Sequence, residues 1–185
     1  MIIKKYQKTL VIISLIFATL LLYFVSLGNY PLMEPDEGRY AEIAREMVES
    51  GDYITPRLNY VHYFEKPPLL YWLNAISFKF LGQNEFAARL ATASLAILGA
   101  VAVAILASVF IGFWGGILSY VITVTSLLYY AIGSITITDM PLSTFITMAL
   151  VAFFIAHKKQ SRISYIIFYL SLALGVLTKG LVVVV

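Results

Sequence analysis

Long apolar runs dominate this chain and restrict the folds that it can adopt. Of its 185 residues, 61% are hydrophobic and only 12% are charged, and the mean hydropathy is +0.87. A run of about 20 apolar residues suits a helix through the ~30 Å hydrocarbon core of a bilayer, and a helix satisfies its own backbone there. We therefore predict an all-α polytopic membrane protein. The expected spans are residues 9–27, 86–110, 113–136, 141–156 and 165–185, with all boundaries approximate.

The first apolar run could be taken for a cleaved signal peptide, because lysines precede it. However, Thr9 to Leu27 is long enough to span a membrane and no small-residue cleavage site follows, which indicates a retained helix. Lysine and arginine are typical of cytoplasmic flanks. The basic residues that set the orientation are Lys4, Lys5, Lys8, Lys158, Lys159 and Arg162. This pattern predicts a cytoplasmic N-terminus and an external loop over about residues 28–85.

That external loop is a polar island in an apolar chain. Nine of the ten acidic residues lie between Glu34 and Glu85, and the tenth is Asp139. Within the loop, residues 37–50 have the apolar spacing of an amphipathic helix. The short apolar stretch 69–73 follows two prolines, and we expect Tyr71 and Trp72 there to lie at headgroup depth. Asp139 and Lys179 fall at the same external side, so the unusual charges converge on one face of the membrane.

Some function classes are excluded at this stage. The chain has no cysteine, so it has neither a disulfide framework nor thiol chemistry. Its basic residues form no stripe interleaved with aromatic residues, so we predict no nucleic-acid partner. Membrane lipids are the expected surroundings.

Two groups in the loop could carry chemistry. Asp36 and Glu37 precede a predicted helix, where they could cap it and complement its dipole. Alternatively, Asp36 is a carboxylate near a low-dielectric boundary that accepts a proton from a nucleophile, and Arg39 binds a phosphate. In Glu65-Lys66-Pro67-Pro68 the first two residues could be a solvated charge pair. The prolines would equally hold Lys66 as a phosphate-binding cation, with Glu65 as a metal ligand.

Asp139 and Lys179 are ionisable residues at the edges of apolar segments. Such residues are costly in a membrane and are often functional. Asp139 could instead be a plain helix N-cap, and Lys179 could reach outward to water.

Together these residues resemble the N-terminal part of the aminoarabinose lipid A transferase family, in the wider clan that includes the protein O-mannosyltransferases. The matching segments are Pro35-Asp36-Glu37-Gly38-Arg39-Tyr40-Ala41-Glu42-Ile43-Ala44-Arg45-Glu46-Met47, Ser50-Gly51-Asp52, Tyr63-Phe64-Glu65-Lys66-Pro67, Asp139 and Thr178-Lys179-Gly180. The resemblance implies a GT-C fold and transfer of a sugar from a polyprenyl-phosphate carrier on the periplasmic face.

The resemblance also implies roles for individual residues. Asp36 matches a carboxylate proposed as catalytic base, and Asp139 a second aspartate of the essential type. The residues expected around the substrate and the carrier phosphate are Lys66, Arg39, Glu37, Tyr40, Tyr63 and Lys179. Glu65 matches a carboxylate that binds a divalent metal, with zinc, magnesium and manganese as the candidates. The family's metal-binding histidine would lie beyond Val185, so we expect the chain to be the N-terminal portion of a longer enzyme.

The predicted function is an inverting glycosyltransferase of the bacterial inner membrane. Its donor would be a polyprenyl-phosphate sugar, and its acceptor a lipid resembling lipid A, a glycan or a protein. Two alternatives stay open: a fragment of a transporter or channel with Asp139 and Lys179 along its path, and a non-catalytic remnant that binds polyprenyl lipids.

Overall fold

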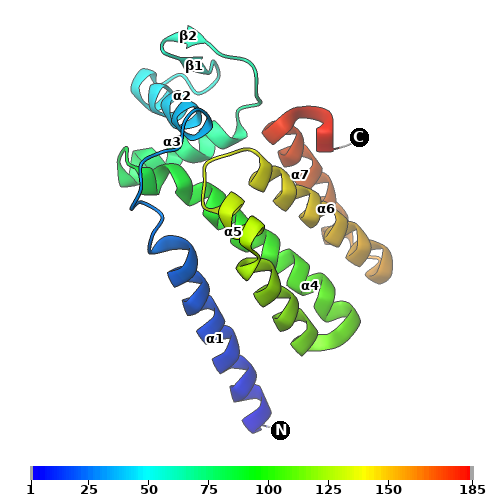
Figure 1. The fold of residues 1–185 in the computed structure, drawn as a ribbon. Helices are drawn as coiled ribbons and strands as arrows, with labels where there is room; N and C mark the ends of the chain where they lie inside the picture. Colours follow the sequence, from blue (N-terminus) through cyan, green and yellow to red (C-terminus); the bar gives the residue numbers. More distant parts are fainter. Residues whose placement is uncertain (1, 184–185) are drawn as a thin grey trace.

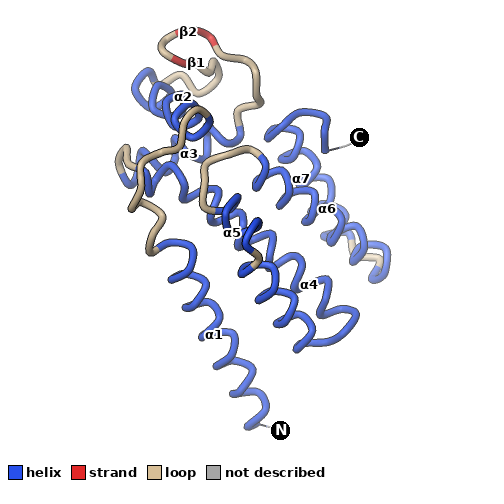
Figure 2. Tube along the Cα trace, in the orientation of Figure 1, coloured by secondary structure: helices blue, strands red, loops and turns tan. Residues whose placement is uncertain are grey.

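A computed structural model describes residues 2–183 of the chain, with side chains described from residue 6 onward. It is almost entirely helical (Figures 1 and 2). In chain order the elements are α1 (Ile2–Phe24), α2 (Asp36–Ser50), β1 (Arg57–Leu58), β2 (Val61–His62), α3 (Leu69–Leu81), α4 (Glu85–Thr125), α5 (Leu127–Gly133), α6 (Asp139–Lys159), α7 (Arg162–Lys179) and the 3₁₀ turn η1 (Gly180–Val183).

The long helices form a bundle whose two ends differ. At one end lie the start of α1, the break in α4 and the α6–α7 junction; at the other lie α2, α3, the β1–β2 hairpin, the start of α6 and the end of α7 (Figure 1). Helices α1, α4, α6 and α7 are long and apolar enough to cross a membrane. We call the end that carries α2 and α3 the polar end. The acidic segment, Asp139 and Lys179 all lie there.

Helix α4 is two antiparallel arms rather than one rod. Gly112 has φ 76° and ψ −177° and interrupts the helix there. This backbone conformation is essentially restricted to glycine. The arms then pack closely, since a Cβ on Gly116 would lie 2.8 Å from the carbonyl oxygen of Ala104. The second arm ends at Thr125, because Ser126 is extended, and α5 completes the return. The expected single helix 113–136 is therefore wrong: it is broken at Ser126 and ends at Gly133.

The other predicted boundaries also shift. Helix α1 begins at Ile2 and ends at Phe24 rather than spanning 9–27, because its basic N-terminal residues continue the helix. Helix α6 extends beyond the predicted 141–156 at both ends. Helix α7 starts at Arg162, and the last two residues of the predicted span 165–185 lie outside the described residues.

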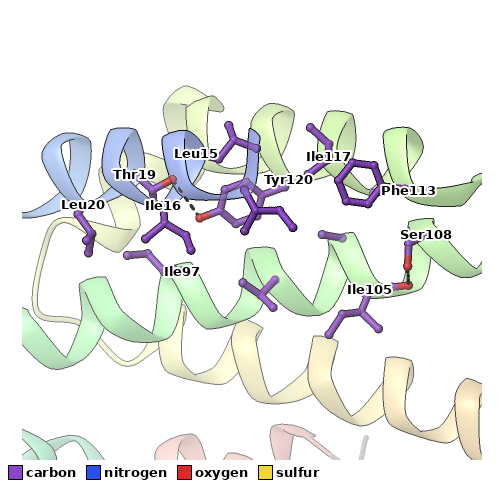
Figure 3. Close-up of a pocket in the computed structure, with 14 residues that line it drawn as sticks. Leu15, Ile16, Thr19, Leu20, Ile97, Ile105, Ser108, Phe113, Ile117 and Tyr120 are labelled. Carbon is purple, nitrogen blue, oxygen red and sulfur yellow. Dashed lines mark hydrogen bonds between the residues drawn. The ribbon is translucent and has the colours of Figure 1, made fainter. Parts of the chain in front are cut away.

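Helix α1 meets α4 along an apolar groove (Figure 3). The groove has a volume of about 410 Å³. One wall contains a hydrogen bond of 3.0 Å from the Tyr120 hydroxyl to Thr19 Oγ1, and the Tyr23 hydroxyl donates to the Val124 carbonyl at 3.2 Å. The outer surface of α1 is otherwise rich in exposed isoleucine, leucine and phenylalanine, as expected for a lipid-facing helix.

Helices α2 and α3 build a small core of their own at the polar end. The amphipathic helix predicted for 37–50 is present as α2, and its Ile43 and Met47 pack with Leu70 of α3. Tyr71 is wholly buried against Tyr40. Because α2 covers α3, the Tyr71 ring contacts protein, and its position at headgroup depth stays a prediction. Trp72 is half-buried and donates to the Tyr53 carbonyl at 2.6 Å.

Candidate active site

The predicted site residues come from four segments that meet at the polar end. These are the first turns of α2, the loop from Tyr63 to Pro68, the start of α6 and the end of α7 (Figure 1). The loop follows the β1–β2 hairpin, whose turn residue Tyr60 donates its backbone N–H to both carboxylate oxygens of the buried Glu46, at 3.1 Å each. The hairpin therefore ties the loop to α2.

A polar chain runs from α2 into the loop. Asp36 lies 3.9 Å from the Arg39 guanidinium, Arg39 donates to the Tyr63 hydroxyl at 3.4 Å, and Tyr63 donates to Glu65 Oε2 at 2.8 Å. Burial raises the pKa of Tyr63, and its hydrogen bond to Glu65 raises it further. The hydrogen bond to Tyr63 raises the pKa of Arg39. The phenol is therefore a neutral donor between a cation and a carboxylate.

Tyr40 lies on the buried side of α2. It packs on Tyr71 with ring centroids 5.9 Å apart. Burial raises its pKa, as do the nearby Asp36 and Tyr63, while a contact with Thr138 acts in the opposite direction. Tyr40 thus connects the α2 motif to the residue before Asp139.

Asp139 and Lys179 form an ion pair that joins the start of α6 to the end of α7. The alternative prediction, an N-cap by Asp139, is wrong. Thr138 occupies the N-cap position with no side-chain cap hydrogen bond, because Asp139 is already the first helical residue and its carboxylate faces Lys179. Both side chains remain partly exposed.

An open hollow of about 480 Å³ lies between the loop and the end of α7. Its lining includes Glu65, Lys66 and Lys179, together with aromatic and proline side chains. Within residues 6–183, Lys66 forms no ion pair or hydrogen bond, whereas Lys179 is paired with Asp139. The volume falls in the ordinary range of small-ligand pockets. Asp36 and Asp139 do not line this hollow, so the structure brings the two lysines together there and leaves the two aspartates beside it.

Glu37 is not placed as predicted. It is 1% exposed, and both of its oxygens face Arg89 of α4, so its carboxylate does not line the hollow. Burial alone would raise its pKa, but hydrogen bonds from Arg89 and from the backbone N–H groups of Met33 and Thr136 outweigh that effect and lower it. Glu37 is therefore an ionised internal anchor, which corrects its assignment as a carrier-phosphate contact.

Arg89 was not identified from the sequence. It lies early in an apolar run, where a charge requires an internal partner. That observation could have flagged it, because the preceding external loop supplies the carboxylates. The identity of its partner, 52 positions away, could not be read from the pattern.

A complete metal site is not formed by the described residues. Glu65 is the only predicted ligand, and its carboxylate accepts a hydrogen bond from Tyr63. Residues 6–183 contain no group of three or more metal-ligating side chains, whereas a zinc site needs three or four protein ligands. His62 lies on β2 and packs against Phe64.

Comparison with known proteins identifies the family. The family model described as dolichyl-phosphate-mannose-protein mannosyltransferase matches residues 8–185. The chain belongs to this family. It is 36% identical over 177 residues to the undecaprenyl phosphate-alpha-4-amino-4-deoxy-L-arabinose arabinosyl transferase of Aeromonas hydrophila, covering 88% of this chain and 31% of that protein. The similarly named protein of Enterobacter sp. strain 638 is 36% identical over 185 residues, covering 96% and 32%.

The fold is shared with solved structures of this family. Crystal structures of ArnT from Cupriavidus metallidurans, in the apo state and bound to undecaprenyl phosphate, superpose with a TM-score of 0.89 and 30% identity. They match 94% of this chain and 33% of that one. The predicted fold class, an all-α multi-pass membrane protein of the GT-C type, is confirmed. The chain spans about a third of the length of the relatives that it matches.

Proposed function

We propose that the complete protein transfers a sugar from a polyprenyl-phosphate carrier to a lipid, glycan or protein acceptor. The observation that carries this proposal is the hollow at the polar end, which is lined by Lys179 and by Lys66, a lysine with no ion-pair or hydrogen-bond partner within residues 6–183. The Aeromonas hydrophila relative is named for arabinosyl transfer from undecaprenyl phosphate-alpha-4-amino-4-deoxy-L-arabinose, which supports the same donor class. Among the acceptors, a lipid A-type molecule is the one that the resemblance of the sequence motifs implies.

The chemistry follows from the charges around the hollow. An acceptor oxygen attacks the anomeric carbon of the sugar, the bond from that carbon to the carrier phosphate breaks, and polyprenyl phosphate leaves with the electron pair. The reaction inverts the anomeric configuration. Lys66 stabilises the negative charge that grows on the leaving phosphate, in a site preorganised for it. Asp36 orients a hydroxyl acceptor and takes its proton.

Lys179 and Asp139 act at the second side of the hollow. Their ion pair places a lysine ammonium at its edge while Asp139 holds that ammonium in position. Arg39 is held by Tyr63 and keeps a positive charge next to the carboxylate of Asp36, which accepts the proton. These assignments make Asp36 the catalytic base, give Lys66 and Lys179 the role of phosphate binding, and make Asp139 the residue that positions Lys179.

The cellular setting is part of the proposal. The clustering of Lys158, Lys159 and Arg162 at the opposite end of the bundle supports an orientation with that end in the cytoplasm. The polar end would then lie on the periplasmic side of a bacterial inner membrane. Polyprenyl-phosphate sugars and their acceptors are both membrane-bound, so the hollow near the lipid boundary suits their encounter.

A transfer assay with the purified full-length protein tests the function. Defined polyprenyl-phosphate sugars and lipid A-type acceptors are supplied in detergent or nanodiscs, and the product is followed by mass spectrometry. We expect Asp36→Asn to lower turnover by about 10²-fold or more. Glu34→Gln is the matched control, because Glu34 is an exposed carboxylate two residues away. Turnover near wild type in Asp36→Asn, or no transfer by the wild-type protein with any supplied donor, contradicts the proposal.

A further inference from the structure

A fully buried charged pair, Arg89 and Glu37, lies outside the hollow. The side chains of Arg89 and Glu37 are 0% and 2% exposed and form a two-point ion pair, with Nε 2.9 Å from Oε1 and Nη2 2.8 Å from Oε2. Two charges buried this deeply are stable only if their remaining hydrogen-bonding groups are also satisfied. Both partners meet that condition through the backbone.

The Arg89 side is surrounded by carbonyl groups. Nη1 donates to the carbonyls of Leu27 and Tyr30, each at 2.9 Å, and Nη2 donates to that of Pro31 at 2.8 Å. The guanidinium also lies over the Tyr30 ring, 3.9 Å from its centroid. Arg89 therefore fixes the segment that leads from α1 into α2.

The Glu37 side is surrounded by backbone N–H groups. Oε2 accepts from Met33 at 2.8 Å, and Oε1 accepts from Thr136 at 2.7 Å. The segment of Thr136 is tied further, since the Thr136 hydroxyl donates to the Ala88 carbonyl and the Tyr30 hydroxyl donates to the Ser134 carbonyl at 3.0 Å. One pair thus joins α2, α4, the α1–α2 connection and the α5–α6 connection.

This junction stands directly behind the two aspartates. Glu37 is adjacent to Asp36, and Thr136 precedes Asp139 by three residues. The aspartates come from segments about 100 positions apart, and Glu37 holds both segments through one carboxylate. We propose that Arg89 and Glu37 are positioning residues that set the placement of Asp36 relative to Asp139. This inference rests on the proposed transfer reaction for its effect on turnover.

The surroundings make the pair directional. The position of Glu37 needs an acceptor for two N–H groups, and the position of Arg89 needs a donor for three carbonyls. Exchanging the two residues would restore the charge pair. It would, however, place the guanidinium donors against backbone N–H groups and the carboxylate acceptors against backbone carbonyls. We therefore expect the exchange Glu37→Arg with Arg89→Glu not to rescue function. Arg89→Lys also fails, since one ammonium cannot replace the planar five-donor fork.

A distance measurement tests the placement without relying on activity. Residues 1–185 contain no cysteine, so spin labels are introduced at Glu34→Cys and Ile137→Cys in the full-length protein, with any cysteine outside this segment replaced by serine. Pulsed electron paramagnetic resonance should give one narrow distance distribution with Glu37 and Arg89 intact. In Glu37→Gln and in Arg89→Lys we expect it to broaden or split. A distribution as narrow as in the parent overturns the proposal.

Kinetics separates positioning from general structural loss. Because Lys66, the phosphate-binding lysine with no partner within residues 6–183, lies on another segment, Glu37→Gln should lower kcat by at least about tenfold and leave KM for the polyprenyl-phosphate sugar within about threefold. Glu37→Gln preserves the shape of the side chain, so it still tests the proposal if Arg89→Lys fails to fold. Arg45→Lys is the matched control, because Arg45 pairs with Glu42 and Glu49 on the solvent side of α2.

The outcomes distinguish this proposal from the proposed function. A kcat within twofold of wild type in Glu37→Gln contradicts positioning, as does a fall in kcat matched by the same fall in folded protein. If the wild-type protein transfers no sugar, the proposed function fails. The spin-label distances would still show whether the Arg89–Glu37 pair fixes the two segments.

Discussion

Lys66 and Lys179 line the same hollow but differ in whether a carboxylate already neutralises the ammonium charge. Lys179 is paired with Asp139, while Lys66 has no hydrogen-bond or ion-pair partner within residues 6–183. An unpaired ammonium offers its full charge to an incoming phosphate, and a paired one must share it. The two lysines should therefore contribute unequally to carrier binding.

That difference can be measured with polyprenyl phosphate as the ligand. We expect Lys66→Ala to weaken its binding by about 10-fold or more, on the scale of one lost hydrogen bond to a charged group, and Lys179→Ala to weaken it less. Lys79→Ala is the control, because Lys79 is an exposed lysine on α3 that does not line the hollow. Equal losses of affinity in Lys66→Ala and Lys179→Ala would contradict the idea that Asp139 neutralises part of the Lys179 charge.

Glu37 makes stability depend on acidity. Its pKa in the folded protein is lowered from 4.5, so its contribution is complete above that value and is lost as the pH falls through the lowered pKa. Glu37→Gln should lower the melting temperature at pH 7, and the difference from wild type should shrink below about pH 4.5. Thermal unfolding in detergent across pH 3–7 checks this, with Glu34→Gln as control. A constant difference at all pH values would show that lost ionisation is not the cause.

At the scale of elements, Gly112 allows α4 to fold back on itself. Its positive φ with ψ near 180° lies in a region that costs other residues about 1–3 kcal/mol. Gly112→Ala should destabilise the protein by that amount, although a Cβ there would meet no other atom within 4 Å. Gly38→Ala is the matched control, since Gly38 also has free space but sits within helix α2, where alanine is favoured. Unfolding free energies of the two variants decide the point, and equal stability would contradict it.

The same elements show what the sequence could and could not predict. Apolar length and periodicity were sufficient to predict the long helices and α2, because both report directly on burial in lipid or in a core. They could not predict the break at Ser126 or the two-residue strands. The turn between those strands has positive φ at Asn59 and Tyr60, and it is held by the distant Glu46. Local signals do not contain such tertiary contacts.

At the scale of the whole molecule, the sequence predicted that the acidic loop, Asp139 and Lys179 lie at one end of the bundle. That prediction depended on the number of times the chain crosses the bundle between them. The count survived its boundary errors, because the two arms of α4, the second continued by α5, still cross the bundle twice (Figure 1). Asp139 and Lys179 therefore meet as expected. Arg89 escaped prediction because its role depends on five hydrogen bonds to distant residues, three to carbonyls of the α1–α2 connection and two to the Glu37 carboxylate.

The arrangement of charge at the two ends of the bundle leads to a topology prediction. Residues 1–185 contain no cysteine, so single cysteines introduced there are informative once any cysteine elsewhere in the protein is replaced by serine. A cysteine at Glu34 or Ile54, both exposed at the polar end, should react with a membrane-impermeant maleimide added to intact spheroplasts. A cysteine at Gln160, exposed in the α6–α7 turn, should react only after the membrane is opened. The basic residues beside Gln160 favour retention of that turn in the cytoplasm. Labelling of Gln160→Cys from outside, with protection of Glu34→Cys, would place the hollow on the cytoplasmic side. Labelling of both positions from outside would contradict a bundle whose polar and basic ends lie on opposite sides of the membrane.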